Sequence, residues 1–182
     1  MRWQVHGERS LYSSHWLSFN LADVELPTGR RFEYEVVRSP AASVGVVVSD
    51  PARGVLMLWR HRFIPDTWGW ELPAGRMEEG ETPAEAGARE VLEETGYRPG
   101  PLEPLYSYHP SPGVQDQVHH VMAAAGAVEI GAPVDWFESE RVAWLGIDQV
   151  TSELRSGGIH DGMTLSALCW CLAFGRLTGA SS

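Results

Sequence analysis

Apolar and polar positions in the first third of the chain follow patterns typical of β-strands. The strand-like segments are residues 16–21, 31–37, 44–48 and 55–62. Pro27-Thr28-Gly29 separates the first two segments and predicts a hairpin turn between them. We therefore expect an N-terminal antiparallel β arm over residues 1–40, followed by the first strands of a main sheet. Residues 41–182 are expected to form the main domain, so that the whole chain is one domain with an extension.

A helical periodicity replaces the strand pattern between residues 82 and 97. Glu90, Glu93 and Glu94 stand at i, i+3 and i+4, so a helix places them on one face. The opposite side is expected to carry the apolar residues Ala84, Ala88, Val91 and Leu92. The expected boundary residues are an N-cap, a proline at the first position, a capping-box partner and a terminating glycine: Thr82, Pro83, Glu85 and Gly96.

The carboxylates at the end of this helix need a counter-charge. Glu93 and Glu94 lie in the last turn, where the helix macrodipole disfavours negative charge. A bound cation would relieve this repulsion, and ligands that are all oxygen atoms select hard ions, Mg²⁺ first and Mn²⁺ next. The alternative is an acidic face that is simply solvated, which is the usual explanation for a run of charges.

The spacing around these glutamates is more specific than a charge run. Residues 75–97 fit the pattern G-x5-E-x7-R-E-U-x-E-E-x-G-U, where U is apolar. The matching positions are Gly75, Glu81, Arg89, Glu90, Val91, Glu93, Glu94, Gly96 and Tyr97. This pattern resembles the Nudix box of the Nudix hydrolases, and Tyr97 in place of an aliphatic residue is its only soft match. The resemblance implies an α/β (α+β) fold, an α/β/α sandwich around a mixed β-sheet, and hydrolysis of a diphosphate that joins a nucleoside to another group.

The resemblance also assigns roles inside the box. Glu90 and Glu94 would bind the metal directly, and Glu93 would help to bind it or act as a base. Arg89 would orient the glutamates, and Glu81 would support Arg89 through an ion pair.

Residues just before the box complete the expected metal and phosphate site. The carbonyl of Ala74 is a further implied ligand, and Gly75 suits close approach of the backbone to an ion. Arg60 and Arg62 lie two apart in a strand and emerge on one face. We interpret Arg60 as part of a solvated edge and Arg62 as a substrate contact, because a guanidinium can grip phosphate oxygens through two hydrogen bonds.

Outside the box the chain is similar to the ADP-ribose pyrophosphatase branch of the family. The segments that carry this likeness are 71–75, the Ser111-Pro112-Gly113 turn with Pro112 fifteen residues beyond Tyr97, the acidic loop 138–140, the arm that includes Arg38, and 157–161. In that branch a glutamate of the acidic loop binds metal or activates water, so Glu138 or Glu140 would do so here. The alternative for either residue is an ordinary surface acid.

The same resemblance suggests where the nucleotide binds. Trp16 and Arg38 would hold the adenine between a ring and a guanidinium, although Trp16 could also be a core aromatic. Pro112 would lie near the substrate, and Gln117 stands where relatives commonly carry a glutamate near the ribose, unless Asp116 compensates. In this branch the N-terminal arm is exchanged between two subunits, which implies a homodimer.

Composition and charge exclude several other classes of protein. The formal net charge of −10 argues against a general nucleic-acid surface. No apolar run reaches the roughly 18 residues of a membrane helix, and residues 1–10 lack the apolar core of a signal peptide, so we expect a cytoplasmic protein without a membrane partner. Cys169 and Cys171 lie two apart in an apolar stretch, and we expect two buried, inert thiols that form neither a disulfide nor a zinc site.

Together these features predict a Mg²⁺-dependent hydrolase, with Mn²⁺ as a substitute, that cleaves the diphosphate of a nucleoside diphosphate sugar. ADP-ribose is the leading candidate, giving AMP and ribose 5-phosphate. The alternatives are another sugar nucleotide, a dinucleoside polyphosphate or a damaged nucleoside triphosphate. An isomerase of the same fold is disfavoured because both cysteines lie in the apolar tail, and the intact box disfavours a module that senses a nucleotide without cleaving it.

Overall fold

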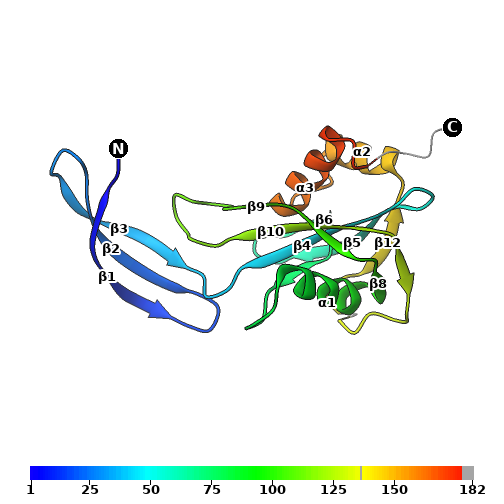
Figure 1. The fold of residues 1–182 in the computed structure, drawn as a ribbon, viewed down its shortest axis with the longest axis horizontal. Coiled ribbons are helices and arrows are strands. Elements are labelled where there is room, and N and C mark those ends of the chain that lie inside the picture. The colour runs from blue at the N-terminus through cyan, green and yellow to red at the C-terminus, as the bar shows by residue number, and fades with distance from the viewer. Residues whose placement is uncertain (136, 178–182) are drawn as a thin grey trace. The chain divides into compact units, whose positions relative to one another are not determined.

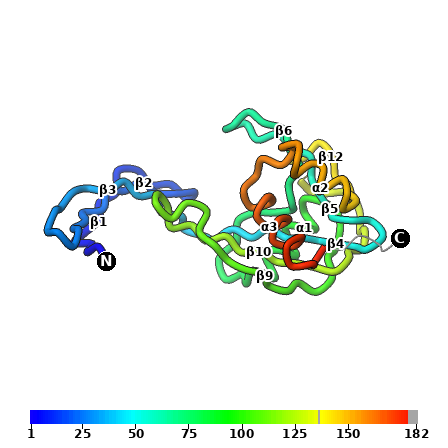
Figure 2. Tube along the Cα trace, turned by 90° about the horizontal axis from the view of Figure 1, so that it is seen from above, coloured from blue at the N-terminus to red at the C-terminus, as the bar shows by residue number. Residues whose placement is uncertain are grey.

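The computed structural model describes residues 1–135 and 137–177, which form two compact units. The first unit comprises Met1–Ala42 together with Tyr108–Val118. The second unit begins at Ser43, is interrupted after Ser107 and resumes at His119. The first unit includes the residues of the predicted β arm together with an eleven-residue segment from the middle of the chain (Figures 1 and 2).

The N-terminal unit is built on a three-stranded antiparallel sheet in the order β1-β2-β3 (Figure 1). Its strands are β1 Gln4–Ser13, β2 Ser18–Glu25 and β3 Arg31–Arg38. The predicted turn between β2 and β3 is confirmed, because Gly29 has a positive φ of 82° and the Leu26 N–H donates to the Arg30 carbonyl at 2.9 Å. The middle segment of the chain joins this unit through the Val37 N–H, which donates to the Val114 carbonyl at 2.8 Å.

A mixed sheet of seven strands organises the second unit. Its strands are β4 Ser43–Asp50, β5 Gly54–Arg62, β6 Thr67–Glu71, β7 Ala74–Arg76, β9 Leu102–Tyr108, β10 His119–Ala125 and β12 Arg141–Leu145. The order is β12-β5-β4-β10-β9, with β6 paired to β5 and β7 paired to β4. β10 runs parallel to β4, whereas β12 and β6 run antiparallel to β5. β8 Tyr97–Pro99 and β11 Ala127–Glu129 form a separate two-stranded sheet.

Helices cover both faces of this sheet (Figure 1). α1 Pro83–Thr95 lies on one face, and α2 Ile147–Ser156 and α3 Gly162–Ala173 lie on the other. The expected α/β/α arrangement around a mixed sheet is therefore confirmed. None of the helices in the described residues is both long enough and apolar enough to cross a membrane.

The expected start and end of α1 are confirmed in detail. The Thr82 hydroxyl accepts from the Glu85 N–H, and the Glu85 carboxylate accepts from the Thr82 N–H at 2.9 Å. Gly96 ends the helix with a positive φ of 75°, and its N–H donates to the Leu92 carbonyl.

The buried side of α1 differs from the prediction. Val91 is buried as expected, but the other buried small residues are Ala86 and Gly87, not Ala88. A Cβ at Gly87 would stand 2.7 Å from Leu102 and 2.9 Å from Val46, so the missing side chain lets the helix lie close to the sheet. Gly87 was missed because glycine does not register as apolar in a periodic pattern.

The cysteine prediction is half correct. Both thiols are free, as expected, and Cys171 is buried, which raises the pKa of its thiol to about 11. Cys169 is exposed, so the expectation of two buried thiols was wrong for this residue. Residues two apart on a helix point in different directions, and only one of these faces the sheet.

Candidate active site

The last two turns of α1 carry the acids that the sequence singled out. Glu94 is 2% exposed, although it is the last acid of the helix. Glu90 is half-buried, and Glu93 lies closest to solvent, with 36% of its side chain exposed. A carboxylate buried as deeply as that of Glu94 requires partners, because an unpaired buried charge costs several kcal/mol or more.

Arg89 holds three of the acids in place. Its Nε and Nη2 donate to the two carboxylate oxygens of Glu81 at 2.8 and 2.9 Å. Its Nη1 donates to Glu90 at 2.8 Å and to Glu93 at 3.1 Å. We call Arg89, Glu81, Glu90 and Glu93 the Arg89 cluster. The ion pair with Arg89 lowers the pKa of Glu81 to about 2.

A second arginine, Arg60, binds the buried acid. Its Nη2 donates to Oε1 of Glu94 at 2.5 Å, and Arg60 is itself only 2% exposed. The other oxygen of Glu94, Oε2, accepts from the Ala74 N–H at 2.9 Å. The interpretation of Arg60 as part of a solvated edge was therefore wrong. The position is covered, and the guanidinium is tolerated there because an acid lies opposite it.

The backbone at Ala74 and Gly75 passes directly between the two predicted metal ligands. Glu94 accepts the Ala74 N–H, and the Glu90 carboxylate rests against Gly75 on the next residue. A Cβ added at Gly75 would stand 2.2 Å from the carboxyl carbon of Glu90. Glycine at this position leaves room for the carboxylate, which would have to move if a side chain were added.

Burial and mutual repulsion oppose the ionised forms of these acids. Burial raises the pKa of Glu94 to about 7, in spite of the opposing effects of Arg60 and the Ala74 N–H. Burial also raises the pKa of Glu90, against the effect of Arg89, and the charges of Glu93 and Glu138 raise it further. A divalent ion would reverse this trend by favouring the charged forms.

The donor set fits a hard divalent ion, but its acids are presently paired with arginines. Among the described residues, no three His, Cys, Asp or Glu side chains converge as a ready metal cage. Mg²⁺ does not need such a cage, because it is commonly held by one or two carboxylates together with water and substrate phosphates. Glu90 and Glu94, on either side of the Ala74–Gly75 backbone, are a suitable set of that kind.

Arg62 lies at the rim of a cavity and is anchored by Glu71. Its Nε donates to both oxygens of Glu71 at 3.0 and 3.1 Å, and its Nη2 donates to Oε2 at 2.6 Å. Glu71 is buried, whereas half of the Arg62 side chain is exposed, so the guanidinium is fixed from behind. It lines a cavity of about 470 Å³ between the β5–β6 hairpin and the start of α3.

The acidic loop places one of its two candidate glutamates beside the buried acids. Oε2 of Glu138 lies 4.0 Å from Nη1 of Arg60, and the charge of Glu138 acts on Glu90. Glu140 is exposed, and its N–H donates to the Trp59 carbonyl at 2.9 Å at the start of β12. The geometry therefore favours Glu138 over Glu140 as the loop carboxylate of the site.

The predicted nucleotide contacts lie in the N-terminal unit. Arg38 donates to both oxygens of Glu8 and, through Nη1, to Asp116 at 3.3 Å. Trp16 is 62% exposed in the β1–β2 turn, next to Ser18, which pairs with Arg38 across the sheet. Trp16 is therefore not a core aromatic, and the guanidinium of Arg38 is fixed by acids on two sides.

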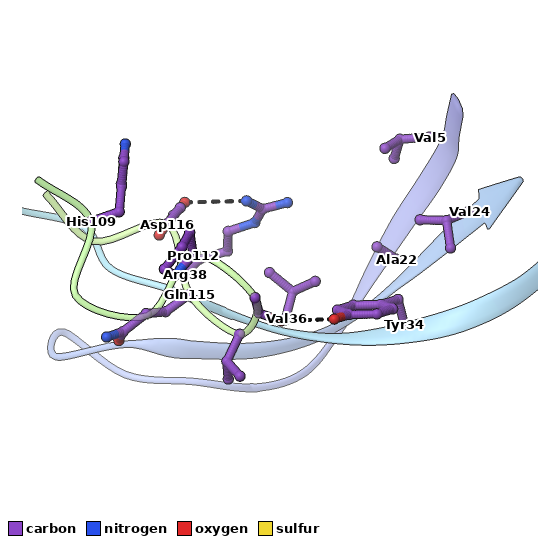
Figure 3. A pocket seen from close by; sticks show the side chains of 12 residues that line it. Val5, Ala22, Val24, Tyr34, Val36, Arg38, His109, Pro112, Gln115 and Asp116 are labelled. Atoms are coloured by element: carbon purple, nitrogen blue, oxygen red, sulfur yellow. Dashed lines mark hydrogen bonds and ion pairs between the residues drawn. The ribbon is translucent and has the colours of Figure 1, made fainter. Parts of the chain in front are cut away.

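A cavity of about 360 Å³ lies beside Arg38 in the same unit (Figure 3). Pro112 lines it, together with apolar side chains of the sheet such as Val24 and Val36. Asp116 closes one end through its ion pair with Arg38. The Gln117 carbonyl lies 3.0 Å from Nδ1 of His109 at the end of this segment.

The sequence reading missed Arg60 and Glu71 as site residues. Glu71 was seen only as part of a motif, and its role as the anchor of Arg62 appears in the structure alone. A signal for Arg60 did exist. The uninterrupted apolar run Val55–Leu58 indicates a strand that is buried on both faces. Arg60 lies on the same face as Leu58, so burial of Arg60 could have been predicted.

Two family models and several known proteins match this chain. A model of the NUDIX domain matches residues 39–164, and a model of the nucleoside diphosphate sugar hydrolase N-terminal domain matches residues 3–37. The chain is 42% identical over 175 residues to the CMP-5'-(N-acetyl-N-hydroxy-3-aminopropyl)phosphonate hydrolase of Streptomyces rubellomurinus, covering 96% of this chain and 84% of that one.

Two further comparisons place the chain among related proteins. It is 28% identical to the ADP-ribose pyrophosphatase of Bacillus subtilis over 163 residues, which is 88% of each chain. The crystal structure of an ADP compounds hydrolase superposes with a TM-score of 0.85 and 16% identity, covering 97% of this chain and 95% of that one. The second comparison shows that the fold is shared.

Proposed function

The chain belongs to the NUDIX family and is a pyrophosphohydrolase, and we propose that it hydrolyses the diphosphate bond of a nucleoside diphosphate sugar. The proposed leading substrate is ADP-ribose, which would give AMP and ribose 5-phosphate. The observation that carries this proposal is the set of acids around Ala74 and Gly75, with Glu90 and Glu94 on either side of one backbone segment.

The divalent ion is the first part of the proposal. Glu90, Glu94 and the Ala74 carbonyl would hold it, and Glu93 would assist from the exposed side of α1. A bound Mg²⁺, or Mn²⁺ in its place, would neutralise charge on the diphosphate and make the attacking water more acidic. Arg89 keeps Glu90 and Glu93 turned toward one another by donating to both carboxylates.

The protein's own groups would carry the proton and the phosphate charge. Glu138 would accept the proton of the attacking water, since it lies in a loop beside the acids and half of its side chain is open to solvent. Arg62 would contact the diphosphate oxygens with the donors that Glu71 leaves free. Its fixed position means that little ordering is needed when the substrate arrives.

The N-terminal unit would recognise the nucleoside. Trp16 offers an exposed ring, and Arg38 offers a guanidinium plane held by Glu8 and Asp116, which is a suitable pair for a purine base. Pro112 and Gln117 belong to the middle segment of this unit and would contact the ribose side of the substrate. The match to a nucleoside diphosphate sugar hydrolase N-terminal domain supports this assignment.

A homodimer is the proposed assembly. β1 is exposed along its whole length and carries exposed apolar side chains, among them Val5, Leu11 and Tyr12. An edge strand with such side chains is a typical surface for pairing with a second copy. Light scattering behind a sizing column tests this, with a mass near twice the 20.1 kDa of one chain expected.

The decisive experiment is a product profile in H₂¹⁸O. ADP-ribose, other sugar nucleotides, dinucleoside polyphosphates and oxidised nucleoside triphosphates would each be incubated at one Mg²⁺ concentration. Release of AMP and ribose 5-phosphate with one ¹⁸O supports the proposal, and the labelled product identifies the phosphorus atom that is attacked. Absence of turnover with every diphosphate would overturn it.

A second candidate substrate is a CMP-linked phosphonate. The observation in its favour is the 42% identity to the hydrolase of such a compound over 96% of this chain. A CMP-linked phosphonate therefore belongs in the same panel. CMP release at a higher kcat/KM than AMP release from ADP-ribose would favour this second candidate.

A further inference from the structure

Arg60 is surrounded by acids from three different parts of the second unit. Each nitrogen of its guanidinium faces a different carboxylate. Nη2 donates to Glu94 of α1 at 2.5 Å, Nε lies 3.9 Å from Glu71 of β6, and Nη1 lies 4.0 Å from Glu138 of the acidic loop. We call Arg60, Glu71, Glu94 and Glu138 the Arg60 cluster. One buried cation is thus shared by a predicted metal ligand, the anchor of Arg62 and the predicted general base.

Burying these charges costs desolvation free energy, which suggests that the arrangement is kept for a function. Arg60 is 2% exposed and follows the apolar run of β5. Replacing a buried ion pair by apolar residues of similar volume is often neutral or stabilising. Nε of Arg60 has no hydrogen-bond partner among the described residues, so the guanidinium is not placed for maximum stability.

The geometry indicates that Arg60 orients the carboxylates around it. Both oxygens of Glu94 are fixed, one by Arg60 and one by the Ala74 N–H, and each oxygen keeps a lone pair free. Glu138 is different, because 4.0 Å is an ion-pair distance without a hydrogen bond and 46% of its side chain is exposed. Arg60 therefore holds Glu94 rigidly and attracts Glu138 without tying it down.

We propose that Arg60 is a positioning residue that presents the carboxylates of Glu94 and Glu138 to the divalent ion and the attacking water. This inference rests on the proposed function, since it assigns Arg60 a part in the same site. It goes beyond the box motif, in which the orienting arginine is Arg89. Arg60 acts through other side chains and contacts neither the ion nor the substrate.

The first test measures Mn²⁺ binding without substrate, by electron paramagnetic resonance of the free ion. The variants are Arg60→Met, which has a similar volume and no charge, and Arg60→Lys, which keeps the charge but lacks the planar fork. The control is Arg176→Gln, because the Arg176 side chain forms an ion pair with Glu103 at the surface. Thermal unfolding of each protein is measured in parallel.

The expected result is a Kd for Mn²⁺ that is about tenfold to hundredfold weaker in Arg60→Met, in the range known for residues that support metal ligands. Arg60→Lys is expected to fall between the wild type and Arg60→Met, and Arg176→Gln to match the wild type. A change in unfolding temperature with unchanged Mn²⁺ affinity would show a merely structural role and overturn the proposal. If Arg60→Met does not fold, the Mn²⁺ affinity of Arg60→Lys tests the proposal, and an affinity equal to that of the wild type would overturn it.

A double-mutant cycle tests the link to Glu138. If Arg60 positions Glu138, the loss of kcat caused by Arg60→Lys should shrink once Glu138 is replaced by Gln. Losses of kcat that simply multiply would overturn this half of the proposal. The two proposals can also fail separately. A wild type that binds Mn²⁺ but hydrolyses no diphosphate would refute the proposed function, while unchanged Mn²⁺ affinity in an active Arg60→Met would refute the role of Arg60.

Discussion

Two arginine–carboxylate clusters contact the acidic face of α1 and differ in where their members come from. In the Arg89 cluster every member lies between Glu81 and Glu93, and the Arg89 side chain is 23% exposed. In the Arg60 cluster the members come from β5, β6, α1 and the acidic loop, and the Arg60 side chain is 2% exposed. The same chemistry is thus built once from local sequence and once from tertiary contacts.

The two clusters therefore have different structural roles in the site. The Arg89 cluster sets the conformation of one helix and the loop before it, which a local motif can do alone. The Arg60 cluster ties that helix to the sheet and to a loop that arrives much later in the chain. Both clusters hold a predicted metal ligand, Glu90 in the first and Glu94 in the second. The following predictions test how much each cluster contributes.

Replacing Glu94, the buried metal ligand proposed in the Arg60 cluster, should cause the largest loss of kcat. Glu94→Gln is expected to lower kcat about a thousandfold, since metal-assisted charge stabilisation is worth several kcal/mol in the transition state. Steady-state kinetics on the substrate that the panel identifies would measure this, and calorimetry should show that the ligand still binds. Glu103→Gln, at the surface pair with Arg176, is the matched control. An unchanged rate for Glu94→Gln would remove the assignment of that residue.

The acidic loop should show the next largest effect, at one of its two glutamates. Glu138→Gln is expected to lower kcat about a hundredfold or more, as for the loss of a general base. Glu140→Gln should stay within about twofold of the wild type, because it is Glu138 whose carboxylate lies 4.0 Å from the guanidinium of Arg60. The same kinetic assay compares the two variants. A larger loss at Glu140 would reverse the choice that the geometry favours.

Gly75→Ala should displace the carboxylate of Glu90, the proposed metal ligand that Arg89 holds. The new methyl group would meet the Glu90 carboxyl carbon at 2.2 Å, so the carboxylate must move away from the backbone. We expect Mn²⁺ affinity to fall about tenfold, the lower end of the range for disturbed ligand orientation. Gly7→Ala is the control, because a Cβ there meets no atom within 4 Å. Equal Mn²⁺ affinity in both variants would contradict the predicted closeness of backbone and ion.

Metal affinity should depend on pH through Glu94. Burial raises the pKa of this acid to about 7 in the metal-free protein, and the ion must displace the proton. Mn²⁺ affinity is therefore expected to rise by up to about tenfold per pH unit below pH 7 and to level off above it. Titrations from pH 5.5 to 8.5 would show this slope, and Glu94→Gln should flatten it. A slope that survives in Glu94→Gln would assign the titration to another group.

The stability of the metal-free protein follows from the same shift. The folded pKa of Glu94 lies above the ordinary value of 4.5, so the folded state binds the proton more tightly than the unfolded state does. This contribution to stability is complete below pH 4.5 and is lost as the pH rises through about 7. Urea unfolding of the metal-free protein at several pH values would detect it.

The smallest predicted effect concerns the partly buried ion pair of Arg89 with Glu81. Arg89 lowers the pKa of Glu81 to about 2, so the stabilisation is present above pH 4.5 and is lost as the pH falls through about 2. Glu81→Gln should reduce the free energy of unfolding at pH 7 by at most about 1 kcal/mol, as for a partly exposed ion pair. The gap to the wild type should narrow at pH 3 in urea titrations. A gap that widens in acid would show that the pair with Arg89 is not its source.

Much of the site could be predicted because its signals are local. The Thr82 cap, the Gly96 terminus and the shared face of Glu90, Glu93 and Glu94 all follow from helix geometry, and the structure contains each of them. The contacts of Arg89 with Glu81 and Glu90 also lie within the motif. The strand pattern likewise predicted β3, β4 and β5 to within one residue at each end, apart from the extension of β4 to Asp50.

Residues whose surroundings come from distant segments could not be predicted in this way. Arg60 was interpreted as part of a solvated edge because arginine is rarely buried, yet it is 2% exposed and pairs with Glu94 at the end of α1. Gly87 was absent from the predicted buried face because its role depends on the side chains of Leu102 and Val46. The choice between Glu138 and Glu140 needed the position of the loop relative to Arg60.

The family motif, the helix with its caps and the identity of the acids follow from the order of the residues alone, because each depends on residues within a few turns of one another. The three-dimensional packing was needed to show which arginine pairs with Glu94, which face of α1 is covered, and which loop glutamate lies beside the acids. The physical reason is that burial and pairing of a charge are set by what packs against it. For Arg60 those partners come from three other elements of the fold.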